Sequence, residues 1–202
     1  MNVAARTEAM REIRDEVLAL SISPLYEYRT KNHYFPVIGE GNHSAELMFI
    51  GEAPGRTEAQ TGRPFVGAAG RVLEELLESV GLTREEVYIG NILKDRPPEN
   101  RDPLPEEIAV YGPFLDRQIE IIQPHIIATL GRYSMGYIMR KFDLELEIQP
   151  ISYMHGKFFK TKASYGDIIV LCLYHPAVAV YNSKMKEPLK KDFEIVKELL
   201  KK

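Results

Sequence analysis

The sequence has one cysteine and no tryptophan among its 202 residues. A lone cysteine cannot form an internal disulfide, and it cannot supply the several thiolates of a cysteine-ligated metal site. Cys172 lies within the apolar run IIVLCLY, which predicts a buried and unreactive thiol rather than a catalytic one. Disulfide-stabilised secreted domains and cysteine-rich metal proteins are therefore excluded as classes.

Long hydrophobic runs and an excess of positive charge are also missing. No apolar stretch is long enough to span a bilayer, and residues 1–17 lack the apolar centre of a secretory signal. We therefore expect an intracellular protein, cytoplasmic in a prokaryote, with no membrane partner. The formal net charge of −3 gives no overall basic field, so any contact with DNA needs a local patch. The lysines from Lys184 to Lys202 are one candidate, although such runs are more often a solvated helix face.

The sequence does contain apolar runs that alternate with amphipathic segments. Strands are predicted by short apolar runs at 47–51, 87–93, 126–130 and 168–173. Helices are predicted by apolar residues at helical spacing in residues 1–20, 72–80, 104–123, 133–142 and 189–200. Gly81 is placed to cap the second helix, and Gly112-Pro113 to break the third. This alternation predicts a mostly parallel sheet covered on both faces, within one domain spanning residues 1–202.

Polar, turn-forming segments follow three of the predicted strands. GEAPG at 51–55 follows the first strand, Asn91 and a proline-rich loop end the second, and His175-Pro176 follows the last. Ligands of parallel sheets bind beyond the carboxyl ends of the strands. We therefore expect these three segments to meet at one edge of the sheet.

Taken singly, each candidate residue also has an ordinary structural explanation. The amides of residues 51–55 could bind a carbonyl or an anion, or simply form a turn, and they do not match a phosphate-binding loop. Glu58 could orient a water or be merely solvated, and Phe65 could stack on a base or anchor a loop. Asn91 could read a base edge or cap a turn, and His175 could donate to an oxyanion or be structural.

In combination, four segments resemble the uracil-DNA glycosylase superfamily, particularly its thermostable branch, family four. They are GEAPGRTEAQTGRPFVGAAG, VYIGNILKDRPPENRDPLPEE, QIEIIQPHIIATLG and LYHPA. The resemblance covers roughly residues 10 to 182. It implies a three-layer αβα sandwich with a central, mostly parallel four-stranded sheet. It also implies an enzyme that flips uracil out of DNA, hydrolyses its N-glycosidic bond and leaves an abasic site without lyase activity. A monomer is the default expectation.

The resemblance implies two overlapping sets of site residues. The uracil-binding set lines the pocket, stacks on the base and reads its edge: Glu52, Ala53, Phe65, Asn91 and His175. The catalytic set holds the attacking water and stabilises the departing uracil: Glu52, Glu58, Asn100 and His175. Which of the two glutamates positions the water stays open.

A further set of residues is expected to contact DNA. Apolar side chains after the His-Pro motif would fill the vacated base stack, while prolines and cations near the second strand would grip phosphates. These residues are Lys94, Arg96, Pro97, Pro98, Val178, Val180 and Lys184.

The chain departs from the family at the ligands of a four-iron, four-sulfur cluster. Leu20, Ser23, Asp95 and Tyr111 occupy the positions at which the family has four cysteines. None of them is a thiolate, so we expect no cofactor and no metal. The hypothesis is that Leu20 and Tyr111 fill the space of the cluster, while Ser23 and Asp95 satisfy polar groups.

Three other functions stay open at this stage. The chain could be a glycosylase with altered or broader specificity for deaminated bases such as hypoxanthine. It could be a non-catalytic relative that binds uracil-containing DNA. It could also be an α/β domain with an unrelated small-molecule site. Base excision and uracil-DNA binding distinguish these readings.

Overall fold

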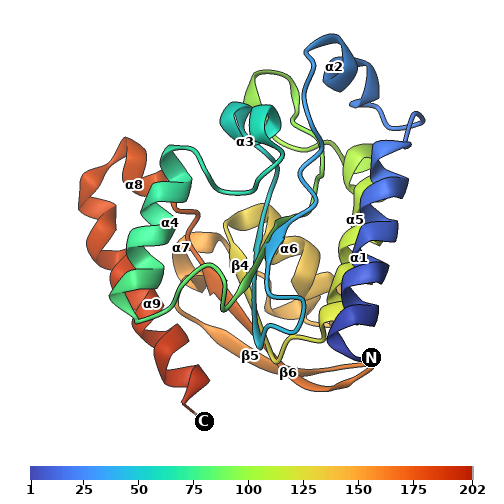
Figure 1. The fold of residues 1–202 in the computed structure, drawn as a ribbon. Coiled ribbons are helices and arrows are strands. Elements are labelled where there is room, and N and C mark those ends of the chain that lie inside the picture. The colour runs from blue at the N-terminus through green and yellow to red at the C-terminus, as the bar shows by residue number, and fades with distance from the viewer. Residues whose placement is uncertain (202) are drawn as a thin grey trace.

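The computed structural model describes residues 1–201, and Lys202, the last lysine of the C-terminal segment, lies outside the described residues. Within them the strands form one six-stranded sheet in the order β1-β3-β2-β4-β6-β5 (Figure 1). The strands are β1 Glu40–Gly41, β2 Leu47–Gly51, β3 Tyr88–Asn91, β4 Ile126–Leu130, β5 Phe158–Ala163 and β6 Gly166–Leu173. The four central strands are parallel, as predicted, and antiparallel β1 and β5 extend the sheet at its edges.

The two edge strands were not predicted, and β5 shows why. Its sequence FFKTKA carries Lys160 and Lys162, and its residues alternate between exposed and half-buried. Edge strands often carry lysines, which discourage pairing with other chains and weaken the apolar pattern. β5 is recognisable only through its hairpin with β6, in which Ala163 pairs with Gly166.

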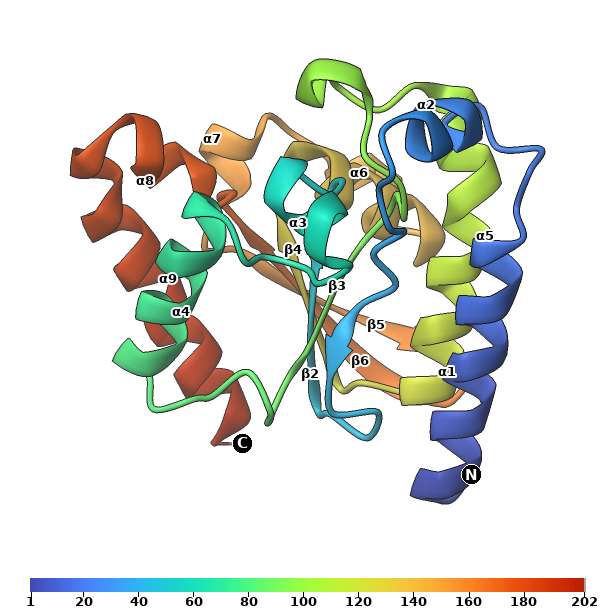
Figure 2. The same ribbon diagram turned by 45° about the horizontal axis from the view of Figure 1, so that its top comes forward.

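Helices cover both faces of the sheet, which confirms the predicted three layers (Figure 2). One face carries α1 Val3–Leu18, α5 Pro105–Ile122, α6 Arg132–Lys141 and α7 Ile151–Met154, packed in one hydrophobic cluster. The other carries α4 Ala68–Ser79, α8 Ala177–Tyr181 and α9 Lys186–Leu200, packed in a second cluster. α2 Tyr26–Lys31 and α3 Arg56–Thr61 belong to the segments at the carboxyl edge of the sheet.

Helix α5 corrects one prediction and α4 confirms another. α5 runs without a break through Gly112-Pro113. Pro113 and Ala109, four residues earlier, are exposed, so water can replace the hydrogen bond that proline removes. A Cβ atom at Gly112 would lie 2.5 Å from the Tyr137 hydroxyl, so glycine permits the close approach of α6. Gly81 caps α4 as predicted: it adopts φ +80° and donates to Glu78 O at 3.0 Å, and Leu82 donates to Leu77 O at 3.0 Å, which together make a Schellman motif.

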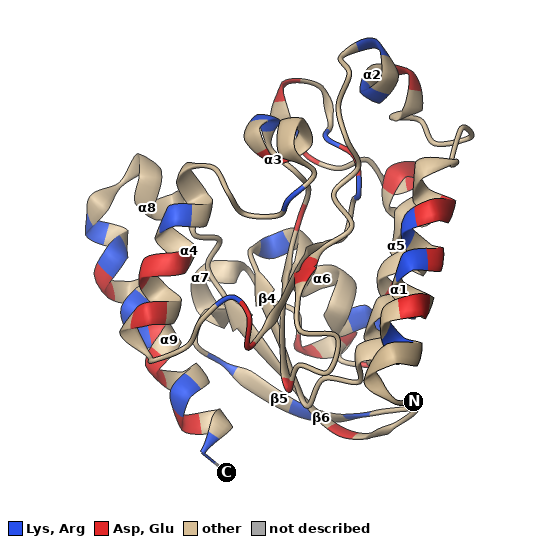
Figure 3. Ribbon diagram, in the orientation of Figure 1, with Lys and Arg blue, Asp and Glu red and all other residues tan. Residues whose placement is uncertain are grey.

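Charge is mixed over the surface helices. Acidic and basic residues alternate along α1 and α9, so the C-terminal lysines share their helix with carboxylates (Figure 3). Every helix within residues 1–201 is too short or too polar to cross a bilayer. α1 buries Met10, Ile13 and Val17, whereas Leu18, an apolar residue of the same predicted helix, is 47% exposed.

The carboxyl ends of the four parallel strands lie along one edge. Gly51 of β2 pairs with Asn91 of β3, and Leu130 of β4 pairs with Leu173 of β6. The predicted convergence of the three polar segments is therefore confirmed.

Candidate active site

A pocket of about 700 Å³ opens at this edge of the sheet. Its size is typical of a site for a small organic ligand. Ten of the predicted site residues line it: Glu52, Ala53, Glu58, Phe65, Asn91, Pro97, Asn100, His175, Val178 and Val180. Four of the predicted DNA-contacting residues lie outside its lining: Lys94, Arg96, Pro98 and Lys184.

Asn91 presents a polar atom that lacks a protein partner. Its side chain is 2% exposed, and Oδ1 accepts no hydrogen bond from any described residue. Gly51 on the neighbouring strand leaves room for it, because a Cβ there would lie 2.4 Å from Asn91 Oδ1 and 2.7 Å from Phe65 Cζ. Buried acceptors in proteins nearly always have a donor. This one is placed to accept from a ligand.

Phe65 and His175 form the walls beside Asn91. Their ring centroids are 5.6 Å apart and their planes differ by 30°. Phe65 has a left-handed backbone, with φ +50°, a conformation that costs a bulky residue about 1–3 kcal/mol. Arg84 stabilises this turn by donating from Nη1 to Phe65 O at 3.0 Å.

Glu58 holds the loop that follows Phe65. Its Oε1 accepts hydrogen bonds from the amides of Val66 at 3.0 Å and Gly67 at 2.7 Å. Gly67 is the N-cap of α4, so the carboxylate also meets the positive end of that helix. The contacts indicate that Glu58 positions the loop, whereas the family resemblance implied that it helps to hold the attacking water.

Glu52 is the other carboxylate of the pocket. The pKa of Glu52 is raised to about 7, chiefly by burial and to a smaller extent by the nearby charge of Asp102, against the opposing effect of Arg132. A carboxylate that titrates near neutral pH is suited to proton transfer in catalysis.

The protonation of His175 follows from its surroundings. Burial lowers the pKa of His175 to about 4, so the imidazole is neutral at neutral pH. Its Nδ1 lies 3.1 Å from the amide of Ala177, which can only donate. Nδ1 is therefore the acceptor and Nε2 carries the proton. The neutral ring can donate one hydrogen bond from Nε2.

Asn100 reaches the pocket from a strained turn. Glu99 and Asn100 have φ values of +54° and +55°. Arg96 holds the turn by donating from Nε to Asn100 Oδ1 at 2.7 Å. Arg96 Nη1 also binds the hydroxyls of Tyr28 and Tyr34, at 3.2 and 3.1 Å.

Two predicted phosphate contacts need correction. Lys94 is fully buried, with Nζ 2.8 Å from Asn91 O and 2.6 Å from Gln118 Oε1. Burial lowers its pKa to about 7. An ammonium group with no exposed surface cannot reach a phosphate, so the prediction for Lys94 is wrong. Arg96 is only 5% exposed, and its hydrogen bond to Asn100 indicates that its main role is to hold that side chain.

The remaining predicted DNA contacts lie in the pocket lining or close to lining residues in the chain. Val180 and the neighbouring Tyr181 on α8 are 44% and 89% exposed. Lys184 is exposed in the short helix η3 Ser183–Met185, which follows α8. On another part of the rim, Pro97 is buried and Pro98 begins the short helix η1 Pro98–Asn100.

One charged pair on the rim was not predicted from the sequence. Arg132 Nη2 lies 2.6 Å from Asp102 Oδ2, and both side chains are about 60% exposed, at 62% and 60%. Arg132 follows Gly131, directly after β4, so the rule about strand ends could have found it. Asp102 is recognisable only through this contact.

The four residues at the positions of the family's cluster ligands lie close together, but their side chains do not fit a cluster. The hydroxyl of Tyr111 lies 2.5 Å from both Ser23 Oγ and Asp95 Oδ2, and Leu20 packs against the same hydrophobic core. Their oxygens are bound to one another, and iron–sulfur clusters are held chiefly by thiolates. Within residues 1–201 no group of three or more histidine, cysteine or acidic residues could hold a metal. Cys172 is fully buried, and burial raises its pKa to about 11.

Comparisons with known proteins identify the family of the chain. The model of the uracil DNA glycosylase superfamily matches residues 38–200. The type-4 uracil-DNA glycosylase of Saccharolobus solfataricus is 48% identical over 189 residues, covering 93% of this chain and 85% of that protein. That of Archaeoglobus fulgidus is 44% identical and covers 95% and 94%, and that of Thermotoga maritima is 38% identical and covers 98% and 97%.

Proposed function

The chain belongs to the uracil DNA glycosylase superfamily, as its sequence motifs predicted, and we propose that it removes uracil from DNA. It hydrolyses the bond between uracil N1 and the sugar C1′, leaves an abasic site, and has no lyase step. It does so without an iron–sulfur cluster. DNA containing a deaminated cytosine is the substrate, and base excision repair is the process that it serves.

The observation that carries this proposal is the unpartnered Oδ1 of Asn91 beside the Phe65 ring. Phe65 offers a flat apolar surface on which a flipped base stacks, which offsets the cost of unstacking it from DNA. The Asn91 amide accepts from uracil N3–H and donates to uracil O4. Cytosine presents an acceptor and a donor in the opposite places, so its binding leaves buried polar groups unpaired.

Bond cleavage needs stabilisation of the departing base. When the C1′–N1 bond breaks, its electron pair leaves with uracil, and the negative charge spreads to O2. The neutral imidazole of His175 donates from Nε2 to this oxygen and acts as an oxyanion hole does. The base then takes up a proton from solvent.

The attacking water needs an acceptor for its proton and a group that holds its oxygen. Glu52 is the available carboxylate, because Glu58 already binds two backbone amides. Asn100 has its Oδ1 occupied by Arg96, which leaves the Nδ2 group to donate to the water. Oxygen from the water bonds to C1′, and Glu52 receives the proton.

DNA is gripped on two parts of the pocket rim. Val178, Val180 and Tyr181 on α8 fill the gap that the flipped base leaves in the stack. Pro97, Pro98 and neighbouring amides contact the phosphate backbone, with Lys184 adding charge. Arg132 exchanges its pairing with Asp102 for a phosphate.

The test uses oligonucleotides with one uracil, single- and double-stranded, followed by alkaline cleavage of abasic sites. We expect strand scission with the wild-type protein and little or none with Asn91→Ala or His175→Ala. Hypoxanthine and cytosine oligonucleotides serve as matched substrates. Folded wild-type protein that cleaves none of the uracil substrates would refute the proposal, and cleavage of hypoxanthine alone would reassign the base.

A further inference from the structure

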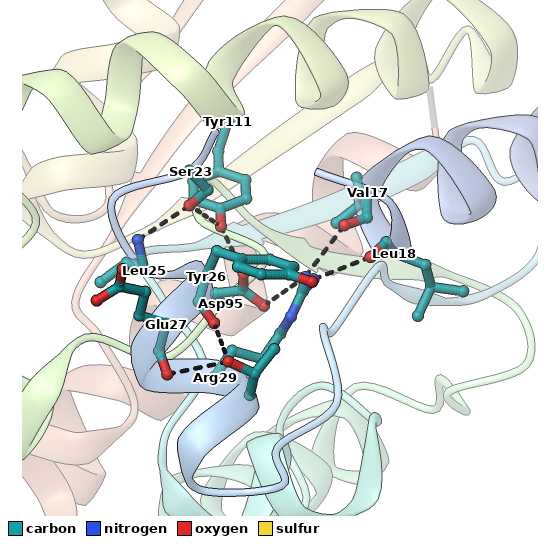
Figure 4. Close-up of polar contacts among 10 residues, drawn as sticks. Val17, Leu18, Ser23, Leu25, Tyr26, Glu27, Arg29, Asp95 and Tyr111 are labelled. Atoms are coloured by element: carbon teal, nitrogen blue, oxygen red, sulfur yellow. Dashed lines mark hydrogen bonds and ion pairs between the residues drawn. The ribbon is translucent and has the colours of Figure 1, made fainter. Parts of the chain in front are cut away.

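Four polar side chains form a buried network at the position expected for the cluster (Figure 4). They are Ser23, before α2; Arg29, in α2; Asp95, after β3; and Tyr111, in α5. The Tyr111 hydroxyl bridges Ser23 Oγ and Asp95 Oδ2, at 2.5 Å from each. Arg29 Nη1 pairs with the same Asp95 oxygen at 3.1 Å, and the two side chains are 6% and 1% exposed.

Arg29 extends the network to the end of α1. It donates from Nη1 to Val17 O at 3.1 Å and from Nη2 to Leu18 O at 2.9 Å. These carbonyls belong to the last two residues of α1, where a cation is favoured, and Val17 O also accepts from the amide of Leu20 at 3.3 Å. The ring of Tyr26 covers the guanidinium at 5.0 Å. Figure 4 shows the guanidinium between the two carbonyls and Asp95, so one side chain joins α1, α2 and the segment after β3.

The network is connected to the pocket through the neighbours of Asp95. Lys94 donates to the backbone carbonyl of Asn91 at 2.8 Å, and Arg96 donates to Oδ1 of Asn100 at 2.7 Å. Tyr28, next to Arg29 in α2, binds Arg96 as well. Helix α2 therefore binds two consecutive residues, Asp95 and Arg96, of the segment 91–100. This segment begins at Asn91 and ends at Asn100, which both line the pocket.

The turn at Asn100 needs such an anchor. Glu99 and Asn100 are both left-handed, and such backbones persist only where surrounding contacts hold them. The partners of Asp95 lie 66 and 16 residues away in sequence, so the segment is tied directly to α2 and α5, and through Arg29 to α1. A rotation of Asp95 would shift Arg96, and with it the side chain of Asn100.

We infer that Asp95, with Arg29, Tyr111 and Ser23, is a positioning centre that fixes residues 94–100 and so places Asn100 in the pocket. The network holds these segments together at the place where the family resemblance implies an iron–sulfur cluster. This inference rests on the proposed glycosylase function. A network that only stabilised the fold would affect unfolding but not the geometry of the site.

The test compares single-turnover uracil excision and thermal unfolding of Asp95→Asn with those of Val196→Ala. Val196 is fully buried in α9, in the other hydrophobic cluster, so its truncation destabilises the protein away from the network. At a temperature where both variants are fully folded, we expect Asp95→Asn to lose about ten- to a hundred-fold in rate. Val196→Ala should stay within about two-fold of wild type.

A double variant separates positioning from stability. If Asp95 acts through Asn100, then Asp95→Asn in an Asn100→Ala background should slow excision no further than Asn100→Ala alone. If Asp95→Asn does not fold, Tyr111→Phe takes its place, because this variant removes only the bridging hydroxyl. Its excision rates are then judged in the same way. A rate for the network variant equal to that of wild type, or losses that multiply in the double variant, would overturn the inference. Inactive wild-type protein would instead overturn the proposed function, and the positioning role with it.

Discussion

Glu58 is bound to the backbone of Gly67, whose amide donates to Glu58 Oε1 at 2.7 Å. The contact fixes the start of α4 and the loop that carries Phe65. We predict that Glu58→Ala costs about 1–2 kcal/mol of stability, as the loss of a helix cap does, and slows excision because Phe65 is displaced. Thermal unfolding and single-turnover kinetics measure the two effects.

Glu58→Gln is the matched control. A glutamine oxygen still accepts from the two amides, so we expect this variant to retain most of the stability and most of the excision rate. If Glu58 instead activated the water, the glutamine variant would be as slow as the alanine variant. That outcome would assign the water to Glu58 and contradict the role of Glu52.

Gly51 keeps the pocket open. A Cβ atom at this position would lie 2.4 Å from Asn91 Oδ1 and 2.7 Å from Phe65 Cζ, so Gly51→Ala fills the space that the base needs. We predict a loss of at least about 100-fold in kcat/KM, the scale on which a misplaced site residue acts. At Gly90, a Cβ would meet its nearest atom at 3.6 Å, so Gly90→Ala should excise uracil normally. Equal activity of the two variants would show that the base binds elsewhere.

The rate of excision should depend on pH through Glu52. Its pKa of about 7 means that the carboxylate form is lost as the pH falls below that value, so the rate should fall with it. Asp102→Asn removes a negative charge that raises this pKa. It should therefore move the acid limb of the profile, the pH range over which the rate falls, to lower pH. A rate profile of Asp102→Asn that coincides with wild type would separate the limb from Glu52.

The same pKa shift predicts an effect on stability. Because the pKa of folded Glu52 is raised above its ordinary value of 4.5, its stabilising contribution is present below pH 4.5 and is lost as the pH rises through about 7. Glu52→Gln should therefore unfold a few degrees higher than wild type at about pH 8, with a smaller difference at about pH 5. An unfolding temperature below that of wild type at the higher pH would mean that the charged carboxylate is stabilised by its surroundings.

His175 should not contribute to the limb near neutral pH. With its pKa lowered to about 4, the imidazole stays neutral throughout that range. His175→Ala should slow excision by about 100- to 1,000-fold, the usual cost of one oxyanion-hole donor, and leave the limb in place. A limb that disappears in this variant would mean that the histidine works as a charged acid.

The sequence predicted the part of the site that depends on strand order. Gly51, Asn91 and His175 stand at or just after strand ends, and parallel strands bring such ends together. The burial of Lys94 and the partners of Asp95 could not be predicted, because charged residues in a loop are normally solvated. Lys94 is buried with a hydrogen bond to Gln118, 24 residues away in sequence, and Asp95 is buried with one from Arg29, 66 residues away. No local pattern reports such distant partners.

The most direct test of the account measures free uracil and iron in one preparation. Purified protein is incubated with an excess of uracil-containing oligonucleotide, the released base is quantified by mass spectrometry, and the iron in the same sample is determined. We predict several uracils released per protein molecule with iron at trace level only. Folded protein that releases no uracil, or release that rises and falls with the iron content, would contradict a cluster-free uracil-DNA glycosylase.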